Sequence, residues 1–248
     1  RPAYEIHERL VSSEMCIRDR YMMKLTENTL QILKNFSAIN SNIVINEGYT
    51  LQTIAEAKNL LAKAEVVENF PKSFGIYDLN EFLSVLNLVD SPQLEFNEEY
   101  VSIADSSGRS KIKYRYADID MLTTVTKDVK MPAHDISFTL DNTTLGRIKR
   151  AAAALGHNEL VIEPDGDGLA SLTVTTVENK TANTYSISVP VESNESIYKL
   201  VFNISNIKVL AGDYNVEISS KLISKFTNSA NSMNYWIALE KTSTYGEQ

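Results

Sequence analysis

The feature that most constrains this 248-residue chain is an internal repeat with a period near 115 residues. Residues 25–45 and 140–162 share a polar capping stretch, an amphipathic helix and a short apolar strand. The matched positions are Leu25 with Leu140, Leu30 with Leu145, Leu33 with Ile148, and Lys34 with Lys149. Solenoid repeats are roughly 20 to 50 residues long, so this longer period indicates a duplicated domain.

A second repeated segment lies further along each half. Residues 76–89 and 201–210 each run from an apolar strand end into an amphipathic stretch, with Asp78 and Asn203 as candidate N-cap residues. We therefore expect a second helix in each half, and Lys208 falls on the later one. The intervening segments alternate apolar and polar residues or carry β-branched and aromatic residues, which is typical of strands. The predicted strands are 49–55, 60–67, 101–104, 111–116, 170–177, 184–189, 214–218 and 235–239.

This pattern indicates an α+β fold with two similar domains at residues 23–117 and 133–248, joined by a connector at 118–132. The connector is polar and ends at Pro132, but it keeps several apolar residues. These are Met121, Leu122, Val125 and Val129.

Residues 1–21 share no periodicity with the repeat, and residues 11–20 resemble translated sequencing-adaptor sequence. We expect a non-native extension, with a genuine N-terminal arm as the alternative. The extension contains Cys16, the one cysteine of the chain. Without it, disulfides, cysteine nucleophiles and cysteine-based zinc sites are excluded.

The charge distribution bears directly on nucleic-acid binding. A net charge of −8 and a pI of about 5.0 argue against it, unless cations cluster on one face. The helix predicted from Asn142 has such a face: Leu145, Ile148, Ala152 and Leu155 share one side, and Arg147, Lys149 and Arg150 occupy much of the rest. A basic face narrowed by alanines suits sequence-independent contact with a phosphate backbone, although an ordinary solvated face is the alternative.

Motifs for catalysis or metal binding are weak throughout the sequence. The run Asp165–Gly168 reads as a β-hairpin turn, because the remaining spaced ligands of a calcium loop are missing. His134 and Asp135 lack an activated serine, and no glycine-rich loop could cradle a nucleotide phosphate. No apolar run approaches the roughly 20 residues of a membrane helix. We therefore expect no enzyme, cofactor, metal or membrane association.

Several ordered segments resemble the T-even-type bacteriophage DNA polymerase sliding clamp. The matching segments are 24–26, 33–36, 39–41, 76–80, 103–105, 211–214 and 238–240. The resemblance implies a two-domain subunit, of which three close a ring with antiparallel sheets outside and helices lining the hole. It also implies an ATP-driven clamp loader, the replicative DNA polymerase and late-transcription factors as partners, in the cytoplasm of the infected bacterial host.

On this resemblance, double-stranded DNA would face cations of both halves without reading its sequence. The candidates are Lys24, Lys34, Arg147, Lys149, Arg150 and Lys208. Asp78 and Glu81 make the first half's second helix acidic, so the lining should be more basic in the second half. Met121, Leu122, Val125 and Val129 would form one wall of a pocket for a partner's hydrophobic tail, unless they only pin the connector to its own sheet.

The alternatives to a sliding clamp are a structural ring protein and a β-rich enzyme. A ring-forming phage structural or baseplate protein would also lack catalytic residues, but it has no need of basic helices lining its hole. A carbohydrate-processing or esterase-like β protein needs paired carboxylates or a nucleophile, and the sequence offers neither.

If the chain forms a homotrimer, we expect edge strands of neighbouring chains to pair across the subunit boundary. The candidate edge strands are residues 110–116 of one chain and 184–189 of the next.

Overall fold

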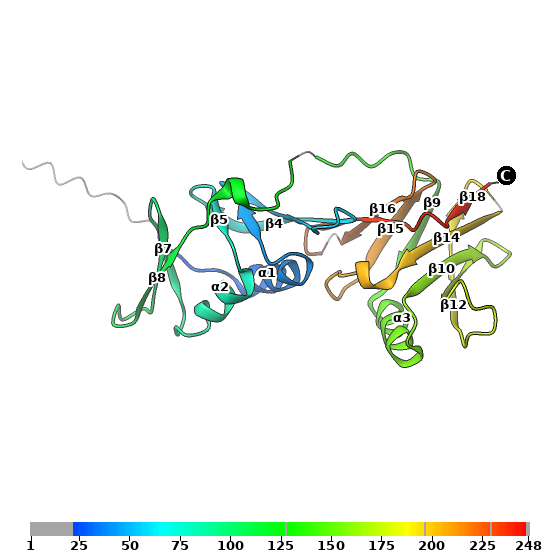
Figure 1. The fold of residues 1–248 in the computed structure, drawn as a ribbon, viewed down its shortest axis with the longest axis horizontal. Coiled ribbons are helices and arrows are strands. Elements are labelled where there is room, and N and C mark those ends of the chain that lie inside the picture. Colours follow the sequence, from blue (N-terminus) through cyan, green and yellow to red (C-terminus); the bar gives the residue numbers. More distant parts are fainter. Residues whose placement is uncertain (1–21, 127, 196, 229, 247–248) are drawn as a thin grey trace, which may run out of the picture.

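The computed structural model describes residues 22–126, 128–195, 197–228 and 230–246. The expectation for residues 1–21 therefore lies outside the described residues. Two halves lie side by side along the longest axis, as Figure 1 shows. The three α-helices of the described residues lie along one long edge, and the connector runs along the opposite edge.

The first half contains the two helices that the repeat predicts. Thr26 caps α1 (Glu27–Ile39) by accepting a hydrogen bond from the Thr29 backbone N–H. Asp78 caps α2 (Leu79–Leu86) by accepting from the backbone N–H groups of Asn80 and Glu81. The strands of this half are β1 (Met22–Met23), β2 (Ile43–Ile45), β3 (Gly48–Ile54), β4 (Leu60–Phe70), β5 (Phe74–Ile76), β6 (Gln93–Phe96), β7 (Tyr100–Ala104) and β8 (Lys111–Arg115).

The second half repeats this order with one helix fewer. Asp141 caps α3 (Asn142–Leu155), and Gly156 ends the helix in the left-handed conformation at φ 68°. The strands are β9 (Ile136–Leu140), β10 (Glu159–Pro164), β11 (Leu169–Thr175), β12 (Tyr185–Pro190), β13 (Glu192–Ser193), β14 (Tyr198–Asn203), β15 (Tyr214–Ser219), β16 (Ile223–Asn228), β17 (Met233–Ala238) and β18 (Thr244–Tyr245).

The expectation of a second α-helix in the second half was wrong. Asn203 does cap a turn, but the turn is only the 3-10 helix η2 (Ile204–Asn206). Beyond it Ile207 and Val209 are buried while Lys208 between them is exposed, which is the alternation of extended chain. Lys208 therefore lies in a loop.

The largest sheet crosses from one half to the other. Its strand order is β13-β9-β15-β16-β17-β4-β3, and β17 pairs antiparallel with β4 from Met233 opposite Ala64 to Ile237 opposite Leu60. The other sheets have the orders β1-β6-β7-β8, β12-β11-β10-β14-β18 and β2-β5. The continuous backbone pairing makes the two halves one structural unit.

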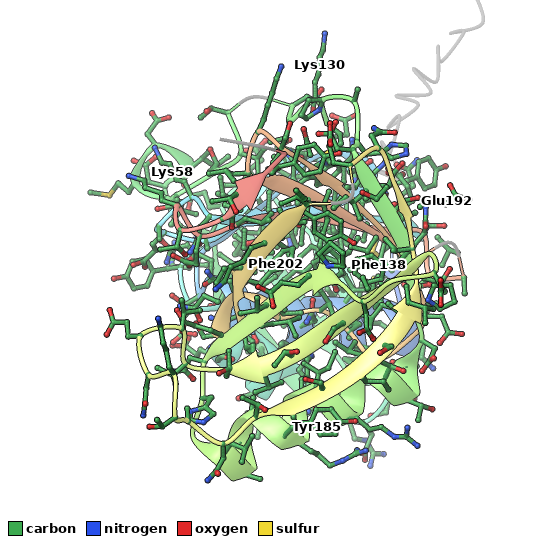
Figure 2. All side chains as sticks on the ribbon, turned by 90° about the vertical axis from the view of Figure 1, so that its right-hand side faces the viewer. Lys58, Lys130, Phe138, Tyr185, Glu192 and Phe202 are labelled. Atoms are coloured by element: carbon green, nitrogen blue, oxygen red, sulfur yellow. The ribbon has the colours of Figure 1, made fainter. Side chains whose placement is uncertain are left out.

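Two edge strands lie at opposite ends of the molecule. β8 ends the first half's sheet and β12 ends the second half's sheet. In Figure 2, which looks onto the second end, β12 lies at the front with Tyr185 near its start. Ile112 and Tyr114 on β8, and Tyr185 and Ile187 on β12, are apolar residues that are only partly buried.

Both halves bury apolar residues between helices and sheets. In α1 the buried residues include Ile32, Leu33 and Phe36, and in α3 they include Leu145 and Ile148. Within the described residues, none of the helices combines the length and apolar character needed to cross a membrane.

Candidate nucleic-acid interface

Two exposed cations of the helix edge lie on α3. Leu145, Ile148 and Ala152 are buried, and Arg147 and Arg150 are exposed on the other side of the helix. The guanidinium of Arg150 lies over Gly146, where an added Cβ would come within 3.3 Å of Nη1. The small residues of α3 therefore leave room for long basic side chains at its surface.

A negatively charged residue, Asp141, caps the start of α3. The backbone N–H of Thr144 donates to Asp141 Oδ1 at 2.7 Å, and this bond does most to hold the pKa of Asp141 below its usual value. The charge of Arg147 contributes in the same direction. Asp141 therefore stays ionised at the N-terminus, where a negative charge suits the helix dipole.

Lys149 differs from its two neighbours, contrary to the expectation that all three cations project from the helix. It is half-buried, and its Nζ donates to the Val209 carbonyl at 3.3 Å. Burial lowers the pKa of Lys149. Its ammonium is thus engaged inside the second half, while Arg147 and Arg150 remain at the surface.

The helix alignment explains this difference. The caps of α1 and α3 do match at an offset of 115, from Thr26 to Asp141. The buried faces of the two helices match better at an offset of 116 residues, which pairs Ile32 with Ile148 and Phe36 with Ala152. One residue turns a helix by about 100°, so Arg150, not Lys149, is the counterpart of Lys34. Lys149 then takes the position of the buried Leu33.

The remaining sequence-predicted cations lie in different settings. Lys34 is exposed on α1. Lys24 is exposed before α1, beside a cavity of about 500 Å³ that Leu30 and Leu86 also line. Lys208 is exposed as well, but its Nζ donates to the Ala38 carbonyl at 2.8 Å. α2 lies beside α1 and carries Asp78 and Glu81.

The four apolar connector residues do not form one wall. Leu122 is buried, and a Cβ added at Gly75 would lie 2.7 Å from its Cδ1, so Leu122 packs on its own half. Met121 is 82% exposed, and Val129 is partly exposed. Val125 lines a small cavity of about 120 Å³ together with Ile43, Val44 and Ile119. Leu122 therefore fits the alternative in which a connector residue only fixes the connector to its own half. Val125 remains a candidate for the wall of a partner pocket.

Among the described residues, no group of three His, Cys, Asp or Glu side chains could hold a metal ion. The run Asp165–Gly168 connects β10 to β11, with the Leu169 backbone N–H donating to the Gly166 carbonyl. The hairpin expectation is thereby confirmed. Sequence reasoning did not identify Asn35 and Tyr235, whose side chains hydrogen-bond across the two halves at 2.8 Å.

The architecture is that of the clamp fold. The chain superposes on proliferating cellular nuclear antigen from Entamoeba histolytica with a TM-score of 0.66 and 17% identity, covering 89% of this chain and 99% of that one. Residues 24–124 match the family model "DNA polymerase processivity factor", and residues 137–241 match "gp45 sliding clamp, C terminal".

Sequence relatives narrow the class further. The sliding clamp of Vibrio phage KVP40 is 32% identical over 222 residues, covering 88% of this chain and 99% of the relative. The sliding clamp of Enterobacteria phage T4 is 28% identical over 230 residues, covering 90% and 99%. The chain belongs to the family of phage sliding clamps, the processivity factors of DNA polymerase. The resemblance found in the sequence is confirmed.

Proposed function

We propose that the chain encircles duplex DNA as part of a ring and tethers the replicative DNA polymerase to it. The observation that carries this function is the gathering of exposed cations on the helix edge of an acidic protein. Lys34, Arg147 and Arg150 are exposed on helices along one edge, although the whole chain has a net charge of −8. Few, mobile phosphate contacts suit sliding, because tight pairing would hold the ring in place. Family membership favours this function over a structural or baseplate ring.

The proposed ring is a head-to-tail homotrimer with clamp domains at 23–117 and 133–248 and a connector at 118–132. The joint inside the chain supports it: β17, the last long strand of the second half, pairs with β4 of the first half. In chain order, β8 and β12 are the counterparts of β17 and β4, and both are sheet edges. Pairing β8 of one chain with β12 of the next would repeat this joint, and three chains would supply six similar units.

Charge favours the same pairing. β8 carries the exposed Lys111, Lys113 and Arg115. Near the edge of β12, Ser188 donates a hydrogen bond to the carboxylate of Asp165, in the exposed turn that also carries Asp167. Opposite charges on two approaching edges steer their association. Lys111 and Lys113 would then lie close to a subunit boundary.

Further partners follow from the family resemblance. We propose that an ATP-driven loader opens the ring and that late-transcription factors also bind it. The chain itself would perform no catalysis and would act in the cytoplasm of the infected bacterial host. The cavity beside Val125 is our candidate for one part of the polymerase-tail pocket, and Met121 and Val129 of the same connector are further candidates for contact with the tail.

The test is processive synthesis with loader and polymerase. The double variant Arg147→Glu/Arg150→Glu should fold and form trimers, but should sharply shorten the products made per loading event. The control is Lys58→Glu, because this lysine is exposed and Figure 2 places it at the upper left, away from α3. Full processivity in the helix variant, or an equal loss in the control, would remove the basis for this interface.

A further inference from the structure

The segment between η2 and β15, residues 207–213, contacts both long helices of the helix edge. It stands where the second half was expected to have its second helix. Ile207 and Val209 anchor it in the core, being 4% and 5% exposed. Its polar groups therefore point toward the helices on either side, and they form bonds to each.

Toward the first half, the segment forms a reciprocal pair of bonds with the end of α1. Lys208 Nζ donates to the Ala38 carbonyl at 2.8 Å, and Asn35 Nδ2 donates to the Lys208 carbonyl at 2.9 Å. All residues of α1 are among those that the structure describes, and its last turn contains no basic residue. A cation at a helix C-terminus interacts favourably with the dipole, and here it comes from the other half.

Tyr235 connects this pair to the sheet. Its hydroxyl donates to Asn35 Oδ1 at 2.8 Å and accepts from the Leu210 backbone N–H at 3.1 Å. Tyr235 is fully buried, and burial raises the pKa of its phenol far above the usual range. Tyr214 Oη donates to the Leu210 carbonyl at 2.8 Å. These bonds are partly buried, so they are costlier to break than the exposed contact of Lys208.

Toward α3, the same segment forms three more bonds. Lys149 Nζ donates to the Val209 carbonyl at 3.3 Å. At the helix start, the Asn142 backbone N–H donates to Asp213 Oδ1 at 2.7 Å, and the Gly212 backbone N–H donates to Asn142 Oδ1 at 2.9 Å. One loop thus holds the C-terminal end of α1 and the N-terminal end of α3.

We infer that residues 207–213 are a strut that fixes α1 relative to α3, with Lys208, Asn35 and Tyr235 as its positioning residues. Lys208 then acts by holding the two cation-bearing helices in place, and not by binding phosphate. Removing the strut should leave each half folded while the angle between them varies more. All of these contacts lie within one chain, so the strut holds or fails independently of the proposed encirclement of DNA.

The first experiment measures the distance between the halves by double electron–electron resonance. Spin labels would be attached at Asp90→Cys and Lys180→Cys, both exposed, in the full chain with Cys16→Ser, and labelled chains would be diluted with unlabelled chains so that the measured pair lies within one chain. We expect Asn35→Ala/Lys208→Met to broaden the distance distribution and Lys34→Met to leave it unchanged. Tyr235→Phe, which keeps the ring and removes only the bridging hydroxyl, should broaden it also. An unbroadened distribution in both strut variants would overturn the inference.

The second experiment separates a strut from a phosphate contact. The salt dependence of duplex binding is measured for Lys208→Met and for Lys34→Met, which remove the same charge. Losing one phosphate contact lowers the log–log salt slope by about 0.9, so we expect that change for Lys34→Met alone. Lys208→Arg should restore the native distance distribution. A slope reduced equally by Lys208→Met would make Lys208 a DNA contact and refute the strut.

Discussion

At the scale of single residues, neighbouring cations of α3 have different roles. Lys149 is half-buried and bonded to Val209, whereas Arg150 is exposed. Lys149→Glu should reduce the free energy of unfolding by on the order of 1–3 kcal/mol, because it leaves the Val209 carbonyl facing a carboxylate. Arg150→Glu should change it by less than about 0.5 kcal/mol. Chemical denaturation of both variants checks this, and equal losses would contradict the assigned environments.

The apolar connector residues allow a second matched comparison. Val125→Ser should weaken binding of a polymerase-tail peptide roughly ten-fold, because it removes apolar surface from the cavity lining. Leu122→Ser should instead destabilise the connector's contact with Gly75, by on the order of 2–4 kcal/mol. Calorimetric titration and thermal unfolding separate the two effects. Unchanged peptide affinity in Val125→Ser would place the pocket elsewhere.

At the scale of elements, a buried carboxylate ties the start of α1 to β4. Glu68, 6% exposed, accepts from the Thr26 backbone N–H at 2.5 Å and from Thr29 Oγ1 at 2.6 Å. Desolvation raises the pKa of Glu68, but these hydrogen bonds together outweigh it and lower the pKa below 4.5. A depressed pKa stabilises the fold fully above pH 4.5, and that stability is lost as pH falls through the folded value.

Glu68→Gln should therefore flatten the acid side of the stability profile. The variant should be less stable than the parent at pH 7 by about 1–2 kcal/mol, because it loses charge-assisted bonds. The difference should shrink as the pH falls from 4.5 toward the lower folded pKa, because the unfolded parent chain binds a proton at Glu68 that its folded form does not yet bind. Urea unfolding at pH 7 and pH 3.5 measures both differences. A constant gap between variant and parent would mean that Glu68 titrates alike in the folded and unfolded chains.

The elements that the sequence predicted are those set by local signals. The caps Thr26, Asp78 and Asp141 and the apolar spacing behind them give all three helices. The prediction of a second helix in the second half was wrong. Ile204 and Ile207 are three residues apart, which is helical spacing, but the buried residues Ile207 and Val209 are two apart, which is the spacing of an extended chain. The choice depends on contacts with α1 and α3, which no local pattern contains.

At the scale of the whole molecule, duplication and the clamp fold could be predicted, but the joint between the halves could not. The pairing of β17 with β4 joins residues far apart in sequence, and period and capping say nothing about such a register. The prediction that Lys149 projects from the helix was wrong for a related reason. Caps fix where α3 begins, but its rotation against the sheet depends on which side chains fill the core.

The internal joint predicts how separate chains should connect. If β8 of one chain pairs with β12 of the next, exposed residues on the two strands become close neighbours. Cysteines at Lys113 and at Ser186 or Ser188, in a Cys16→Ser background, would then lie within the roughly 4.4–6.8 Å Cα separation that a disulfide needs. Oxidation of one of the two pairs should yield a covalent species that stops at three times the 27.8 kDa chain mass.

Closure distinguishes a ring from a filament in this experiment. A heterologous contact that closes limits cross-linking to the trimer, whereas one that does not close produces a ladder of larger species. Each single-cysteine variant, Lys113→Cys or Ser186→Cys alone, should give no covalently linked trimer, because the neighbouring strand offers no thiol. Native mass spectrometry without oxidant should show the same trimer at micromolar concentration. A ladder beyond three chains, or monomer alone with both cysteine pairs, would rule out β8 and β12 as the closing edges.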